Sequence, residues 1–167
     1  MKTDTEPSGL AGWLLLIPIG LVTGIFRMSK AVLTTLNGLT SDDAWTALMT
    51  PPTYHPLLVP LLLFQIVASA LFAVASIALL YLYLRKSQHF PRMFVVYLSL
   101  SVAYVLIYRA VGGFVPAAAE VLNTRAGWVE LVVAATAAAV WIPYILRSRR
   151  VKNTFRVADN GVAPTIH

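Results

Sequence analysis

The chain has 167 residues, of which 58% are hydrophobic and only 12% are charged. A typical soluble domain carries about 25% charged residues, and the mean hydropathy here is +0.73, so the composition excludes both an ordinary soluble protein and a disordered chain. The net charge of +6 is typical of membrane proteins, whose cytoplasmic loops carry excess Lys and Arg, and we therefore expect no nucleic-acid partner.

The residue types that build metal and redox sites are scarce. The chain has no cysteine, which excludes disulfides, thiolate nucleophiles and sulfur-ligated metals. His55, His89 and His167 are far apart in the sequence, so the spacing of a helical zinc-binding pair is missing. Paired carboxylates, a GxSxG motif and a phosphate-binding loop are also missing. We therefore expect no metal, no cofactor and no catalytic residues.

The first apolar segment, residues 9–26, follows a polar tail over residues 1–8. As a helix it is about 27 Å long, which is just enough for one membrane span. Gly20 and Gly24 form a GxxxG motif, which permits close approach of a second helix. The motif is compatible with packing inside the chain and with dimerisation.

Residues 27–56 contain too many polar groups for a span. Arg27 and Lys30 come first, a helix break is expected at Asn37 and Gly38, and Ser41 has the character of a helix N-cap. We expect one or two short helices that lie on the membrane surface. They would serve either as a connector or as a lid over a cavity between the spans.

Three further spans are predicted over residues 57–84, 93–109 and 126–146. The first of these is free of charge, and its Gln65 is expected to hydrogen-bond to another helix. Basic residues fill the loop over residues 85–92. Between Arg109 and the last span, two glycines and a proline predict a loop or a short broken helix at the membrane surface.

The distribution of Lys and Arg predicts the orientation. With four spans the two termini share one side of the membrane, and that side holds nine of the thirteen basic residues: Lys2, Arg85, Lys86, Arg92, Arg147, Arg149, Arg150, Lys152 and Arg156. The other side holds four: Arg27, Lys30, Arg109 and Arg125. The positive-inside rule then places both termini in the cytoplasm.

Four charged residues near the opposite boundary form the candidate polar site: Arg109, Glu120, Arg125 and Glu130. A charge at this depth needs a partner or water. An Arg109–Glu130 pair is the simplest arrangement, with Glu120 and Arg125 as competing partners. Such a pair could fix helix register, line a pocket for an anionic headgroup or gate a proton path.

A basic run follows the last span and includes Arg147, Arg149, Arg150 and Lys152. Near an anionic membrane surface each such residue contributes about 1 kcal/mol of binding. The run is expected to contact anionic lipid headgroups at the cytoplasmic face, although its role in setting the topology explains it without a specific ligand.

Three sequence motifs resemble one bacterial family. The first span opens with GLAGWLLLIP from Gly9, the third opens with Phe90-Pro91-Arg92, and the fourth ends with WIPYILRSRRVKNTF, which closes at Phe155. Together these motifs resemble the family called domain of unknown function 2569, which consists of small inner-membrane proteins with four predicted spans. The resemblance implies a bacterial inner-membrane location and no particular activity.

The sequence therefore predicts an all-α bundle of four transmembrane helices, with short interfacial helices in the first external loop. Residues 9–155 would form one domain between a cytoplasmic tail over 1–8 and a polar tail over 156–167. The first functional hypothesis is a non-enzymatic accessory or assembly subunit that acts through helix contacts, with a membrane-protein partner or a second copy. The alternative is a small transporter or lipid-handling protein with a pocket near Arg109 and Glu130. A membrane enzyme is the third possibility.

Overall fold

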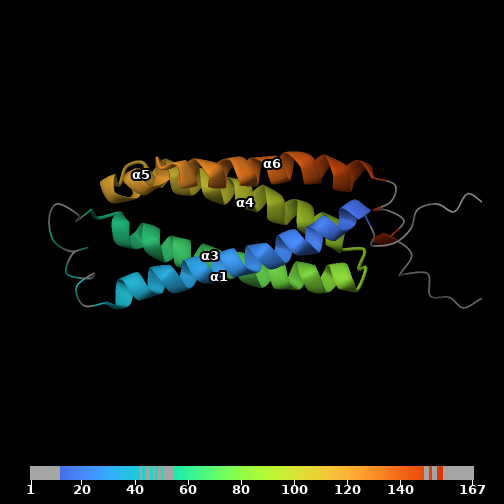
Figure 1. The fold of residues 1–167 in the computed structure, drawn as a ribbon, viewed down its shortest axis with the longest axis horizontal. Helices are drawn as coiled ribbons and strands as arrows, with labels where there is room; N and C mark the ends of the chain where they lie inside the picture. The colour runs from blue at the N-terminus through green and yellow to red at the C-terminus, as the bar shows by residue number, and fades with distance from the viewer. Residues whose placement is uncertain are drawn as a thin grey trace, which may run out of the picture.

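A computed structural model shows an all-α fold (Figure 1). It describes residues 12–41, 43, 46, 48, 50, 55–148, 151, 154 and 155, and no strand occurs in these parts of the chain. A short 3-10 turn, η1 (Gly12–Leu15), leads into the first long helix, α1 (Leu16–Thr40). The helices that follow are α3 (Leu58–Leu84), α4 (Phe90–Gly112), α5 (Pro116–Leu122) and α6 (Arg125–Arg147).

Helices α1, α3, α4 and α6 are long and apolar enough to cross a membrane. Their outer faces carry many exposed aliphatic side chains, among them Ile19, Leu71 and Val132. Water would not support so much exposed apolar surface, whereas hydrocarbon does. The chain therefore has the architecture of a multi-pass membrane protein with a four-helix bundle.

The second, third and fourth predicted spans agree with α3, α4 and α6 to within a few residues. Local sequence explains where these helices begin. Pro91 occupies the first turn of α4, where its missing N–H is harmless. The Thr124 hydroxyl caps α6 by accepting a hydrogen bond from the Gly127 N–H. Of the two alternatives predicted after Arg109, a loop or a short broken helix, the structure shows the helix: α4 ends at Gly112, and α5 begins at Pro116.

The first span differs from the prediction. The expected end at Phe26 and the break at Asn37–Gly38 are wrong, because α1 continues without interruption to Thr40. Arg27 therefore lies in the middle of a long helix and not at the start of a surface loop. The predicted interfacial helix after Ser41 falls mostly on residues outside those that the structure describes.

The helices pack as two antiparallel pairs. Helix α1 packs on α3, helix α4 packs on α6, and α3 joins the pairs through α4. Figure 1 shows that α1 begins and α6 ends at the same end of the bundle, while α5 marks the other end. Towards the α5 end, α1 moves away from the α4–α6 pair (Figure 1).

The largest buried cluster lies at the end where α1 begins, and we call it the aromatic core: Leu14, Ile17, Leu21, Leu79, Tyr83, Phe90, Phe94, Leu98, Ile145, Val151 and Phe155. Phe90 stacks on Phe155 with 4.9 Å between ring centres. The Tyr83 hydroxyl donates a hydrogen bond of 2.9 Å to the carbonyl oxygen of Leu14. All four long helices contribute to this core, so they are fastened together at this end.

Candidate functional site

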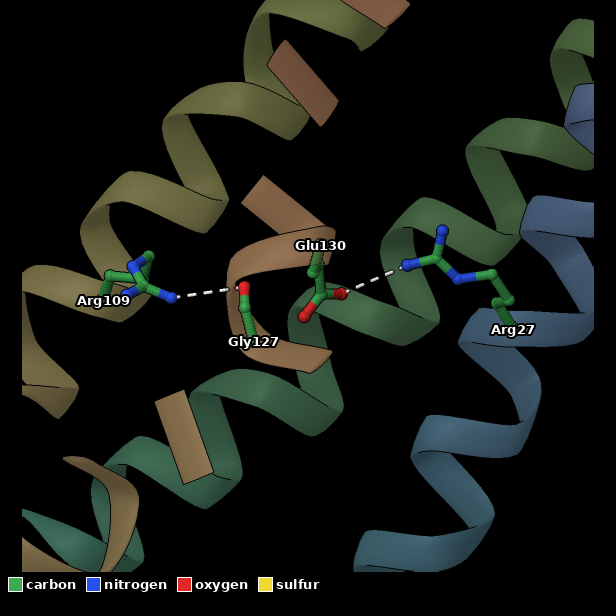
Figure 2. A network of polar contacts seen from close by, with 4 residues as sticks. All are labelled: Arg27, Arg109, Gly127 and Glu130. Atoms are coloured by element: carbon green, nitrogen blue, oxygen red, sulfur yellow. Dashed lines mark hydrogen bonds and ion pairs between the residues drawn. The ribbon is translucent and has the colours of Figure 1, made fainter. Parts of the chain in front are cut away.

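An ion pair joins the middle of α1 to the second turn of α6. The Arg27 guanidinium nitrogen lies 3.2 Å from the Glu130 carboxylate oxygen, and each side chain is about half exposed, at 50% and 49%. The two residues are 103 positions apart in the chain. Figure 2 shows Glu130 on the second turn of α6, with its carboxylate turned towards Arg27. The pair bridges the region where the two helices diverge.

The predicted Arg109–Glu130 pair is not formed. Arg109 instead donates hydrogen bonds to the carbonyl oxygens of Leu122, at 3.0 Å, and Gly127, at 3.2 Å. Its guanidinium also lies over the Trp128 ring, 4.1 Å from the ring centre. Figure 2 shows that Arg109 and Arg27 approach the start of α6 from opposite sides. The prediction placed Arg109 and Glu130 at a similar depth, but depth alone does not say which side of the helix a residue faces.

The two competing candidates, Glu120 and Arg125, are both exposed at the end of the bundle that carries α5. They do not line the cavity that contains Arg109 and Glu130. Arg125 is the first residue of α6, five positions before Glu130. The structure therefore brings together two of the four predicted residues and adds Arg27 to them.

A polar cavity of about 350 Å³ surrounds the ion pair. Its charged and polar lining residues are Arg27, Lys30, Thr34, Thr35, Gln65, Ser69, Tyr104, Tyr108, Arg109 and Glu130. Three of the four charges are positive. Arg27 and Lys30 are exposed, whereas Arg109 is partly buried and donates to two carbonyl oxygens. Arg27 and Lys30 are therefore the cations that a ligand could reach most easily.

A second cavity of about 340 Å³ lies next to it, towards the aromatic core; its lining is mostly apolar but includes Arg27 and Glu130 at one end, and we call it the apolar cavity. It is lined chiefly by α1, α4 and α6, through residues that include Ile17, Gly20, Gly24, Phe94, Leu98, Val133, Ala137 and Trp141. The two cavities share five lining residues: Arg27, Met28, Tyr104, Val105 and Glu130. They therefore lie end to end, and together we call them the α1–α6 groove.

The GxxxG motif lines this groove. A methyl group added to Gly20 would have no neighbour within 4 Å, and one added to Gly24 would meet the Tyr97 hydroxyl at 3.8 Å. No helix of the described chain packs tightly on Gly20. The missing side chains leave space in the apolar cavity, which is an outcome that the packing interpretation of the motif did not anticipate.

Hydrogen bonds between α3 and α4 hold the wall of the groove. The Tyr108 hydroxyl donates to Gln65 Oε1 at 2.9 Å, which confirms the expected interhelical bond of Gln65. A second contact joins the same two helices nearer the aromatic core, where the Tyr97 and Ser76 hydroxyl oxygens are 2.9 Å apart. Satisfied polar groups of this kind fix the position of two helices within a membrane.

The charges indicate where the groove lies relative to a bilayer. On α4 the interval from Arg92 to Arg109 is free of charge, and so is the interval from Glu130 to Arg147 on α6. Each interval rises about 25 Å along a helix, which is close to the hydrocarbon thickness of about 30 Å. The polar cavity then lies at one headgroup boundary, and the apolar cavity extends into the hydrocarbon.

The basic run is described only at its first member. Arg147 ends α6 and is exposed, whereas Arg149, Arg150 and Lys152 lie outside the described residues. No group of three His, Asp or Glu side chains suited to a metal ion occurs within the described ranges. The expected lipid contact of the basic run stays a prediction.

Arg27 and Lys30 are the groove residues that the sequence analysis did not include in the site. A signal was present, because Gly20, Gly24 and Arg27 are spaced i, i+4, i+7 and so share one face of a continuous helix. This reading requires that α1 continue past Phe26. The partner of Arg27 is distant in the chain and leaves no local pattern.

Comparison with known proteins gives one match. A family model described as "Protein of unknown function (DUF2569)" matches residues 7–156, which is most of the chain. The searches of curated proteins and of solved structures gave no match.

Proposed function

The chain belongs to the DUF2569 family, and from this premise we propose that it binds a lipid-like amphiphile in the α1–α6 groove. We further propose that it does so without enzymatic activity, in the bacterial inner membrane and with both termini in the cytoplasm. The family resemblance supports the location, and the excess of Lys and Arg in the terminal segments and in the loop over residues 85–92 supports the orientation.

One observation carries the proposal, which is the end-to-end arrangement of a cationic cavity and an apolar cavity. The cationic cavity has a volume of about 350 Å³ and the apolar cavity about 340 Å³. Both volumes are within the range of about 300–1,000 Å³ for small-molecule sites. An amphiphile would place its polar head beside Arg27 and its chain beside Gly20. The same arrangement would suit a polar solute poorly, because the second cavity is lined mostly by apolar side chains.

The hypothesis of an accessory or assembly subunit stays a prediction. The GxxxG motif was one part of its sequence support, together with the small residues of the second and fourth spans, and Gly20 is accounted for by the space it leaves in the groove. Cross-linking in native membranes would test this hypothesis, since it requires recovery of the chain with a partner or a second copy.

The amphiphile proposal is tested by filling the apolar cavity. A photoactivatable lysophospholipid with a diazirine in its acyl chain is added to the purified full-length protein in detergent. Cross-links are then mapped by mass spectrometry. We expect cross-links at groove residues of α1 and α6, and we expect Gly20→Leu to abolish them.

Gly38→Leu is the matched control. Gly38 is also on α1 and also has no atom within 4 Å of an added methyl group, but it does not line either cavity. Cross-links that persist in Gly20→Leu, or that are lost equally in both variants, would contradict the proposal.

A further inference from the structure

The charges of the polar cavity say what kind of head the groove accepts. Arg27, Lys30 and Arg109 contribute three positive charges, and Glu130 contributes one negative charge. The Arg109 guanidinium donates hydrogen bonds to two backbone carbonyls and lies over the Trp128 ring. For Lys30 no ion pair is found in the described part of the chain. The site is therefore complementary to an anion.

The geometry of Arg27 favours a phosphate. A guanidinium offers several donors in one plane and binds phosphate oxygens through paired hydrogen bonds. In the structure one of its terminal nitrogens is bonded to a single carboxylate oxygen of Glu130. Lys30 follows Arg27 by three residues and therefore lies on the same side of α1. A phosphate group could contact both residues.

Glu130 occupies the position that such a phosphate would need. It lines both cavities and is the acid that meets Arg27 between α1 and α6. Both partners are half exposed, and an ion pair with that exposure exchanges readily for another anion because water screens it. The pair can therefore act as a latch, by which we mean that Glu130 holds Arg27 until another anion displaces it.

We infer that the occupant of the groove is a phosphate-bearing anionic lipid, and that its phosphate binds Arg27 and Lys30 by displacing Glu130. This inference rests on the proposed function and adds to it the class of ligand and the role of the ion pair. The acyl chain then lies along Gly20 and Gly24, while the phosphate stays at the headgroup boundary. Without ligand, Glu130 keeps the Arg27 charge neutralised.

Two matched probes distinguish the contribution of the phosphate to binding from that of the acyl chain. Lysophosphatidic acid with an oleoyl chain and 1-oleoylglycerol differ only in the phosphate group. Their dissociation constants are measured on the full-length protein in detergent by native mass spectrometry. We expect lysophosphatidic acid to bind at least tenfold more tightly. Inorganic phosphate at millimolar concentration should leave this binding unchanged, and displacement by it would show a site for free phosphate.

Variants then test the latch. Arg27→Gln should abolish the preference for lysophosphatidic acid, and Glu130→Gln should increase its affinity several-fold. In the double variant Arg27→Gln/Glu130→Gln the gain from Glu130→Gln should disappear, because Glu130 acts by occupying Arg27. Arg125→Gln, at an exposed position outside the groove, is the matched control and should have no effect.

The outcomes distinguish the two proposals. Equal binding of both probes, still blocked by Gly20→Leu, would overturn the phosphate inference and leave the groove function standing. A gain from Glu130→Gln that persists in the double variant would overturn the latch, since general charge repulsion would then explain it. If neither probe binds in a way that Gly20→Leu blocks, the proposed function itself fails.

Circular dichroism and gel filtration identify any variant that does not fold. Arg27→Lys keeps the positive charge and should restore part of the preference for lysophosphatidic acid that Arg27→Gln removes.

Discussion

The guanidinium carbon of Arg109, on α4, lies 4.1 Å from the centre of the Trp128 ring, on α6. The same side chain donates hydrogen bonds to the carbonyl oxygens of Leu122 and Gly127, so it ties α4 to the corner between α5 and α6. Leu122 is the last residue of α5, and a carbonyl oxygen at the C-terminal end of a helix has no partner within its own helix. Arg109 supplies that partner at the edge of the membrane, where an unsatisfied carbonyl is costly.

This contact predicts that Arg109→Lys destabilises the protein. Lysine has a single ammonium group, which cannot stack on the indole ring and reach both carbonyls in the same way. The hydrogen bonds to a charged donor and the cation–π contact are together expected to contribute about 2–3 kcal/mol. Thermal unfolding in detergent measures the loss. Arg125→Lys is the control, because Arg125 is exposed, and an equal loss there would contradict the assigned role of Arg109.

A series of glycine-to-alanine substitutions tests the packing of the same corner. A methyl group on Gly127 would meet the Leu122 carbonyl oxygen at 2.4 Å, which is backbone and cannot move freely. On Gly112 it would meet the flexible Leu122 Cδ1 at 2.6 Å, and on Gly20 it would meet nothing within 4 Å. Overpacking of this kind costs about 1–3 kcal/mol, whereas an unhindered alanine in a helix gains about 1 kcal/mol over glycine.

The expected order of thermal stability is therefore Gly20→Ala above wild type, then Gly112→Ala, then Gly127→Ala. Melting temperatures measured in one detergent give this order directly. A Gly127→Ala variant as stable as Gly20→Ala would show that the α5–α6 corner is looser than its interatomic distances indicate.

The sequence predicted the helices best where charge was absent. The spans corresponding to α3, α4 and α6 follow from uncharged apolar stretches, because an uncharged stretch of that length has few alternatives to a membrane-spanning helix. The end of α1 was mispredicted because Arg27 and Lys30 indicate a membrane boundary by composition alone. Composition could not reveal that Arg27 is paired with Glu130, a residue on another helix.

In the candidate site, too, the sequence predicted some features and not others. The positions of Arg109 and Glu130 relative to the ends of the predicted spans placed them at one depth, and both do line the polar cavity. Their partners depend on the rotation of α6 relative to α1 and α4, which is a property of tertiary packing and leaves no sign in any single segment. Gln65 was predicted correctly because a lone amide in an apolar helix must find a partner on a neighbouring helix.

The turn between α3 and α4 contains a residue in the left-handed conformation. Lys86 has a φ of 52°, and the following Ser87 N–H donates to the Leu82 carbonyl oxygen, as in a helix C-terminal cap that usually uses glycine. A side chain in this conformation costs roughly 1 kcal/mol. We therefore expect Lys86→Gly to raise the free energy of unfolding by about that amount. Lys86→Ala should give no such gain, and an equal gain would mean that charge and not backbone strain is responsible.

Tyr83 anchors the short turn η1 to the aromatic core. Its side chain is 1% exposed, and its hydroxyl donates to the carbonyl oxygen of Leu14, a residue of η1 that is fully buried. Tyr83→Phe keeps the ring packing and leaves that carbonyl without its donor, which costs about 1–3 kcal/mol when the group is buried. We expect lower thermal stability and faster proteolytic cleavage near η1, since the turn loses its anchor. Tyr81→Phe is the matched control two residues away, because Tyr81 is 52% exposed; cleavage accelerated equally by both substitutions would contradict the anchoring role of the Tyr83 hydroxyl.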